Sequence, residues 1–133
     1  MKYSTIAVDF DGTVVDHQYP DIGPEAPNAI RVLKWLNGMG HKLILNTMRS
    51  DEELQEAVEW FKENQIELYG VAHNPTQKGW TNSPKCYANH YIDDAAVGCP
   101  LLKLPEFNRP CVNWLEIEKY FKGEITYVRN NSD

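Results

Sequence analysis

The stretch from Thr5 to Val8 constrains the fold more than any other part of the sequence. Its residues are β-branched or apolar throughout, as expected for a strand that is buried on both faces of a sheet. Two carboxylates, Asp9 and Asp11, follow directly, and Gly12 and Thr13 come next. Because ligands bind outside the carboxyl ends of strands in open parallel sheets, we expect Asp9 and Asp11 to lie at a functional edge.

The composition is typical of one globular domain that spans residues 1–133, with 42% hydrophobic and 24% charged residues. A net charge of −6 without a basic run argues against nucleic acid as the main partner. Cys86, Cys99 and Cys111 form no Cys-x-x-Cys motif and are expected to be reduced thiols. The absence of a signal peptide and of a membrane span predicts a cytoplasmic protein without membrane contact.

Helical and strand patterns alternate along the rest of the chain, as in an α/β protein. The pattern predicts a doubly covered, mostly parallel sheet. Helices are expected at 25–37, at 51–63 after a Ser50–Glu53 capping box, in a short segment after Ser83-Pro84, and at 114–122 behind Asn113. Further strands are expected at 42–47, 68–72, 90–92 and 124–128.

Three residues near the predicted strand ends are candidates for binding an anion. Thr47 ends the second strand just before a helix begins, where a hydroxyl and oriented N–H groups favour an anion. Arg49 could hold an anion or pair with one of the aspartates. Lys85, in the first turn of its short helix, would approach the same edge, and Lys78 in the preceding loop is the alternative.

Asp93 and Asp94 repeat the pattern of a strand that runs into paired carboxylates. If this strand lies beside the first one, its carboxylates join those of Asp9 and Asp11 at one edge. Such crowding requires a divalent cation to offset the charge. Oxygen ligands without a set of histidines or cysteines favour Mg²⁺ over zinc or copper.

The order of these motifs resembles the haloacid dehalogenase (HAD) superfamily of phosphohydrolases over most of the chain. The motifs are Asp9-x-Asp11-Gly12-Thr13, Thr47, Lys85 and Asp93-Asp94. The resemblance implies a three-layer, Rossmann-like α/β fold with the fourth strand beside the first. It also implies a Mg²⁺-dependent phosphatase that hydrolyses a phosphomonoester through an aspartyl-phosphate intermediate.

The resemblance further implies a role for each motif. Asp9 would be the nucleophile, and Asp11 would protonate the leaving group and later activate water. Thr47 and Lys85 would hold the phosphoryl oxygens. The implied ligands of Mg²⁺ are Asp9, the backbone carbonyl of Asp11, and Asp93 or Asp94.

The intervals between motifs are short, which predicts a member without a cap domain. Its open site would be closed by the loops around His17 and Trp80 or by another subunit, so a large substrate or a homo-oligomer is compatible with it. Sugar phosphates, nucleotides and phosphorylated macromolecular precursors all remain candidate substrates. Asp16 could reach a ligand or hold its loop, and Arg49, His17, Tyr19 and Trp80 are candidates for leaving-group contacts.

Three other functions fit parts of this pattern. A phosphotransferase would pass the aspartyl-phosphate to an acceptor other than water. A catalytically silent member would bind phosphate and metal without turnover. A signalling receiver domain also uses aspartates, a threonine, a lysine and Mg²⁺, but its phospho-accepting aspartate should end a middle strand, where this chain has Asn46 and Thr47.

Overall fold

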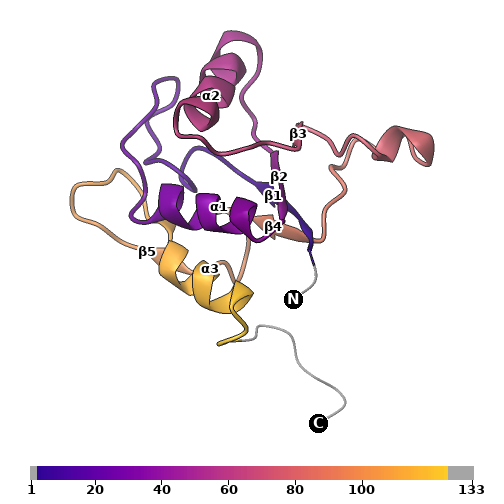
Figure 1. Cartoon of the computed structure of the whole chain (residues 1–133). Helices are drawn as coiled ribbons and strands as arrows, with labels where there is room; N and C mark the ends of the chain where they lie inside the picture. Colours follow the sequence, from indigo (N-terminus) through magenta and orange to yellow (C-terminus); the bar gives the residue numbers. More distant parts are fainter. Residues whose placement is uncertain (1–2, 126–133) are drawn as a thin grey trace.

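The fold is built on a parallel sheet of four strands in the order β3-β2-β1-β4 (Figure 1). The computed structural model describes residues 3–125. Strand β1 (Thr5–Val8) lies between β2 (Lys42–Leu45) and β4 (His90–Ile92), and β3 (Gly70–Val71) pairs with β2. All these pairings are parallel, and the predicted position of the fourth strand beside the first is confirmed.

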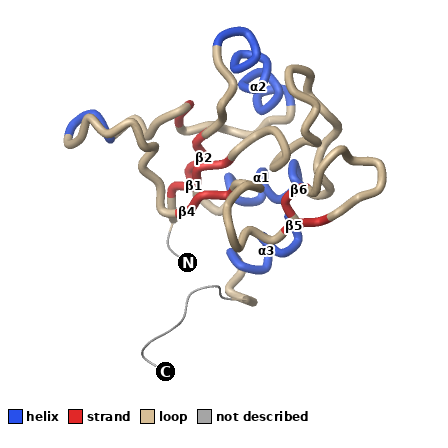
Figure 2. Tube along the Cα trace, turned by 180° about the vertical axis from the view of Figure 1, so that it is seen from behind, coloured by secondary structure: helices blue, strands red, loops and turns tan. Residues whose placement is uncertain are grey.

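The helices cover one face of this sheet. Helices α1 (Ala29–Gly38), α2 (Asp51–Glu63) and α3 (Trp114–Phe121) pack into the same core as Ile6 and Val8 of β1. Figures 1 and 2 show all three helices on the same side of the strands. This placement of α1 and α2 follows from the right-handed crossovers that connect β1, β2 and β3, since successive crossovers in one direction leave their helices on one face.

The other face is covered by the segment of residues 73–89, which holds only the short 3-10 turn η1 (Gln77–Gly79). Its Cys86 and Ala88 pack with Ala7 and Ile44 of the central strands. The rest of the segment projects away from the sheet (Figure 1). The expected helical layer is therefore present on one face only.

The side chain of Gln77 explains why the helix predicted after Ser83-Pro84 does not form. Its amide nitrogen donates to the backbone oxygens of Ser83 and Lys85, at 3.1 and 2.6 Å. Its amide oxygen accepts from the backbone nitrogen of Tyr87 at 3.0 Å. These bonds hold the backbone of residues 83–87 to the 3-10 turn, so the segment satisfies its polar groups without helical hydrogen bonds.

Two helix starts also differ from the sequence pattern. Helix α1 begins at Ala29, because a bridge between Val15 and Glu25 and a bond from Ala26 N to Val14 O keep residues 25–26 extended. Ser50 precedes α2 as predicted, yet its side chain makes no capping bond, so the capping box is not formed.

The carboxyl-terminal half contains one predicted helix cap and one unpredicted hairpin. Asn113 accepts from Glu116 N and caps α3 as expected. Strands β5 (Leu101–Leu102) and β6 (Cys111–Val112) form a small antiparallel sheet that the sequence pattern did not indicate. The strand expected at 124–128 lies mostly outside the described residues. No helix in the part of the chain that the structure describes is both long and apolar enough to cross a membrane.

Trp114 connects α3 to the loop that follows β1. The side chain is 1% exposed, and its indole N–H donates to the backbone oxygen of Thr13 at 2.9 Å. A buried carbonyl that loses such a donor costs about 1–3 kcal/mol. The helix thus fixes the backbone at Thr13 as well as filling the core.

We expect Trp114→Phe to lower the free energy of unfolding by about 2 kcal/mol or more, because it keeps an aromatic ring but leaves the Thr13 carbonyl without its donor. Urea denaturation of the variant measures this loss. Leu115→Ala, at a half-exposed position on the same helix, serves as the control. A loss no greater than that of the control would contradict the anchoring role of Trp114.

Candidate functional site

Three carboxylates converge where β1 and β4 end. The strands pair with Val8 level with Ile92, and Asp9 N donates to Ile92 O at 3.0 Å. Asp9 is therefore the first residue after β1, and Asp93 is the first residue after the neighbouring strand β4. One carboxylate oxygen from each of Asp9, Asp93 and Asp94 lies within 4.8 Å of the others, which confirms the predicted meeting of the two acidic motifs.

The fully buried hydroxyl of Thr13 lies between two of these carboxylates. Its Oγ1 is 3.0 Å from Asp9 Oδ2 and 3.0 Å from Asp94 Oδ1, and it accepts from Asp94 N at 3.0 Å. A hydroxyl has one proton, so it can donate to only one of the carboxylates at a time. Thr13 was part of the sequence motif, but its bridging position depends on the second acidic pair and was not predicted.

The crowding of acids changes the ionisation of Asp9. Burial, the close side chain of Asp94 and the charge of Asp93 together raise the pKa of Asp9 to about 8. In the absence of a cation, the Asp9 carboxyl group therefore holds a proton at neutral pH. A proton held in this way is the expected state of like charges that have no counterion.

This cluster fits a hard divalent cation. It offers only carboxylate oxygens, the ligand type that Mg²⁺ prefers, and a bound cation would relieve the repulsion that raises the Asp9 pKa. The side chain of Asp11, the fourth aspartate in the predicted ligand set, is not part of the cluster.

The carboxylate of Asp11 is held by Arg49 instead. Arg49 Nε and Nη2 donate to Asp11 Oδ2 and Oδ1 at 2.7 and 2.8 Å, which is a bidentate ion pair. The Arg49 side chain is 1% exposed. Of the two roles open to Arg49 from the sequence, pairing with an aspartate is the one seen here.

The remaining donors of Arg49 are also engaged. Nη2 donates to Asp21 O, and Nη1 lies within hydrogen-bond distance of Pro20 O and Glu53 O. A guanidinium has five N–H donors. The three contacts with backbone oxygens and the two with Asp11 account for all five. Arg49 joins the loop after β1, the start of α2 and Asp11, and substrate binding by Arg49 would require one of these bonds to break.

The other candidate phosphate-binding residues are divided between two places. Thr47 lies at the same sheet edge, and its hydroxyl accepts from Arg49 N at 3.1 Å, which leaves its proton free to donate. Lys85 is exposed in the segment of residues 73–89, which covers the face of the sheet without helices. Its ammonium group lies 5.4 Å from the centre of the Tyr91 ring. Lys78 is exposed in η1. Neither lysine lines the cavity at the acidic cluster.

That cavity has a volume of about 410 Å³. Its walls include the four aspartates and Thr47, together with two of the aromatic leaving-group candidates, His17 and Tyr19. Trp80, the third aromatic candidate, is exposed in the projecting segment and does not line it. The remaining lining residues are Met48, Arg49, Ala95 and Arg109.

Arg109 was not predicted as a site residue, because it lies in an irregular segment without a motif or a periodic pattern. The buried carboxylate of Asp16 brings it to the cavity. Both Asp16 oxygens accept from Asn108 N at 3.0 Å. Burial alone would raise the pKa of Asp16. Hydrogen bonds from the backbone of Asn108 and from Gln18 outweigh this effect and hold the pKa of Asp16 below its usual value. Asp16 therefore holds its loop, the second of its two predicted roles.

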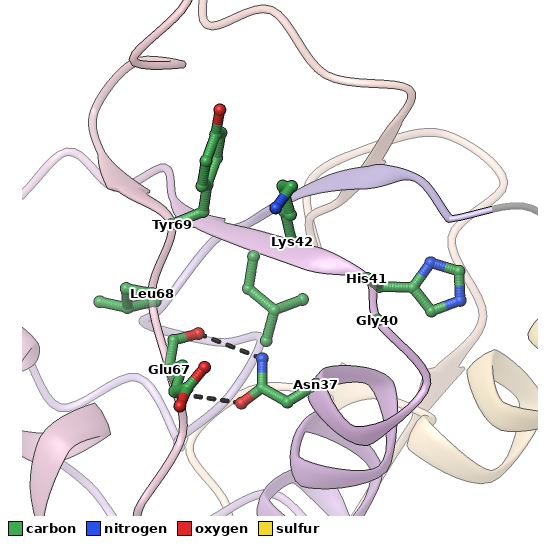
Figure 3. A pocket seen from close by; sticks show the side chains of 8 residues that line it. Asn37, Gly40, His41, Lys42, Glu67, Leu68 and Tyr69 are labelled. Atoms are coloured by element: carbon green, nitrogen blue, oxygen red, sulfur yellow. Dashed lines mark hydrogen bonds between the residues drawn. The ribbon is translucent and has the colours of Figure 1, made fainter.

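A second hollow lies at the opposite, amino-terminal end of β2 (Figure 3). Two of its polar side chains, Asn37 and Lys42, already have partners within it. The Asn37 amide exchanges two hydrogen bonds with the backbone of Glu67, at 2.7 and 3.2 Å, and Lys42 lies over the Tyr69 ring. Among the described residues, this hollow lacks the converging carboxylates of the aspartate cluster, so the carboxyl edge is the better candidate site.

The comparisons with known proteins identify one similar solved structure. It is described as a conserved protein coded by a locus from Bacteroides thetaiotaomicron, with 38% sequence identity, a TM-score of 0.78 and 95% of each chain covered. No protein-family model matches the chain, and no curated protein matches it either.

Gly12 allows Asp94 to approach the loop, which gives a test of the cluster. Gly12 has a φ of 86°, and a Cβ there would lie 2.6 Å from Asp94 Oδ2. Gly12→Ala should displace Asp94 and weaken Mg²⁺ binding by about 10–100-fold, as measured by calorimetry. Gly98→Ala is the matched control, since Gly98 has a φ of 93° with nothing within 4 Å. Equal Mg²⁺ affinity in the two variants would contradict the cluster as a metal site.

The raised pKa of Asp9 predicts a pH-dependent stability. A carboxyl group whose pKa rises on folding from 3.8 to about 8 contributes its full stability below the unfolded pKa, and this contribution is lost progressively between about pH 4 and pH 8. The melting temperature of metal-free protein should therefore fall between about pH 5 and pH 8, and less so with Mg²⁺ or in Asp9→Asn. A decline that is unchanged in Asp9→Asn would show that another group causes it.

Proposed function

We propose that this chain, which belongs to the same family as the conserved Bacteroides thetaiotaomicron protein, is a Mg²⁺-dependent phosphatase of the HAD superfamily. It would hydrolyse a phosphomonoester through an aspartyl-phosphate on Asp9. The observation that carries this proposal is the convergence of Asp9 with Asp93 and Asp94 at one end of a parallel sheet, in a cavity that also contains Thr47.

Asp9 is suited to act as the nucleophile. Its Oδ2 is 3.0 Å from the hydroxyl of Thr13, so Oδ1 is the oxygen left for attack on phosphorus. Attack forms an acyl phosphate on Asp9 and breaks the bond between phosphorus and the leaving-group oxygen. When bound, Mg²⁺ favours the ionised form of Asp9 and neutralises part of the charge on the phosphoryl group.

Asp11 would carry the protons of the reaction. In the first step it gives a proton to the leaving-group oxygen, and in the second it takes one from the water that attacks the aspartyl-phosphate. The ion pair with Arg49 suits the accepting step, because both oxygens of Asp11 accept hydrogen bonds in it. Proton donation requires one of these two bonds to open.

Thr47 would hold the transferred phosphoryl group. Its backbone neighbour Arg49 N already donates to the hydroxyl oxygen, so the hydroxyl proton is directed to another acceptor. Thr47 lies just before α2, where the N–H groups at the helix start favour an anion. The proposed site includes neither Lys85 nor Lys78.

The decisive experiment measures phosphate release from a panel of phosphorylated metabolites with and without Mg²⁺. We expect release to require the metal and to fall by more than about 10³-fold in Asp9→Asn, because the nucleophile is lost. The control is Asp21→Asn, which changes an exposed aspartate outside the cavity. Release that persists in Asp9→Asn, or that proceeds fully in EDTA, would overturn the proposed mechanism.

A further inference from the structure

Arg109 lies at the edge of the cavity and has no place in the proposed chemical steps. We propose that it forms a subsite for a second anionic group, a carboxylate or a second phosphate, on the leaving group of the substrate. This inference rests on the proposed phosphatase function and deepens it. The preferred substrate would then be a small phosphomonoester that carries another negative charge.

Two arginines line the cavity, and only Arg109 is available to a ligand. The donors of Arg49 are all used within the protein. Arg109 is exposed, and within residues 3–125 no carboxylate forms an ion pair with its guanidinium group. An unpaired guanidinium beside a cavity is suited to bind a carboxylate or phosphate through two parallel hydrogen bonds.

The backbone that carries Arg109 is held in place. Both oxygens of the buried Asp16 carboxylate accept from Asn108 N, and Asn108 Nδ2 donates to His17 O at 3.2 Å. These contacts connect the segment before β6 to the loop after β1. Arg109 therefore presents its side chain from a fixed backbone, which reduces the entropy lost when a ligand binds.

The depth of the cavity residues indicates which part of a substrate Arg109 would meet. Asp9 is partly buried at a strand end, whereas Tyr19, Met48 and Arg109 are exposed. In-line displacement places the leaving group on the side of phosphorus opposite Asp9. The leaving group therefore points out of the cavity, toward its exposed edge. A cation at that edge contacts the leaving group rather than the transferred phosphoryl group.

The test compares substrates that differ in one anionic group. The first pair is 3-phosphoglycerate and glycerol 3-phosphate, in which a carboxylate replaces a hydroxymethyl group. The second is fructose 1,6-bisphosphate and fructose 6-phosphate, which tests a second phosphate. Arg109→Gln should lower the kcat/KM ratio within the preferred pair about tenfold, because a charge-assisted hydrogen-bond pair is lost. The matched control is Lys103→Gln, at an exposed cation of the same segment outside the cavity.

A binding measurement separates this inference from the proposed function. Calorimetry compares 3-phosphonopropionate with propylphosphonate, which are not hydrolysed, on wild type and on Arg109→Gln in the presence of Mg²⁺. An Arg109-dependent preference for the carboxylate without any phosphatase activity would support the subsite and overturn the proposed function. Turnover that depends on Asp9, with substrate ratios unchanged in Arg109→Gln, would overturn the subsite alone. An equal loss for both members of each pair would also overturn it.

Discussion

Repulsion among carboxylates is the constraint around which this end of the molecule is arranged. The parallel register of β1 and β4 brings Asp9, Asp93 and Asp94 within 4.8 Å of one another, and the adjacent loop adds Asp11. Charges of one sign at this distance destabilise a fold unless protons, hydrogen-bond donors or cations offset them. Asp11 is offset by the Arg49 guanidinium, whereas Asp9 holds a proton and its cluster is suited to a divalent cation.

These four acids form two groups, which differ in what offsets their charge. Arg49 takes Asp11 into a buried ion pair, and its remaining donors bind backbone oxygens at Pro20, Asp21 and Glu53. Because a broken buried pair costs about 3–5 kcal/mol, this guanidinium is expected to be part of the structural framework. The other three acids accept hydrogen bonds from the Thr13 hydroxyl and from Ala95 N, and the pKa of Asp9 is raised. Within residues 3–125 none of them forms an ion pair, so they retain a capacity for a cation.

The sequence predicted best those features that depend on short-range pattern and parallel topology. The buried strand before Asp9 was readable from its β-branched and apolar run, and a second strand was expected before Asp93. The meeting of the two acidic motifs follows once β4 pairs with β1. The features that were missed depend on contacts of individual side chains that no periodic pattern encodes. The Gln77 side chain replaces the helix predicted after Ser83-Pro84. Likewise, the contacts of Asn108 with Asp16 and His17 bring Arg109 to the cavity.

Helices cover one face of the sheet, and an irregular segment covers the other. Local stability should therefore differ between the two faces. The loop after β1 contributes Phe10, Val14 and Val15 to the larger, helix-covered core. By contrast, residues 73–89 cover only a small cluster around Ala7 and Ile44. Local opening of this segment should therefore cost less free energy than global unfolding, and it would leave the aspartate cluster assembled. Cys86, which this segment buries against Ala7 and Ile44 of the sheet, becomes a chemical reporter of such opening in the native protein.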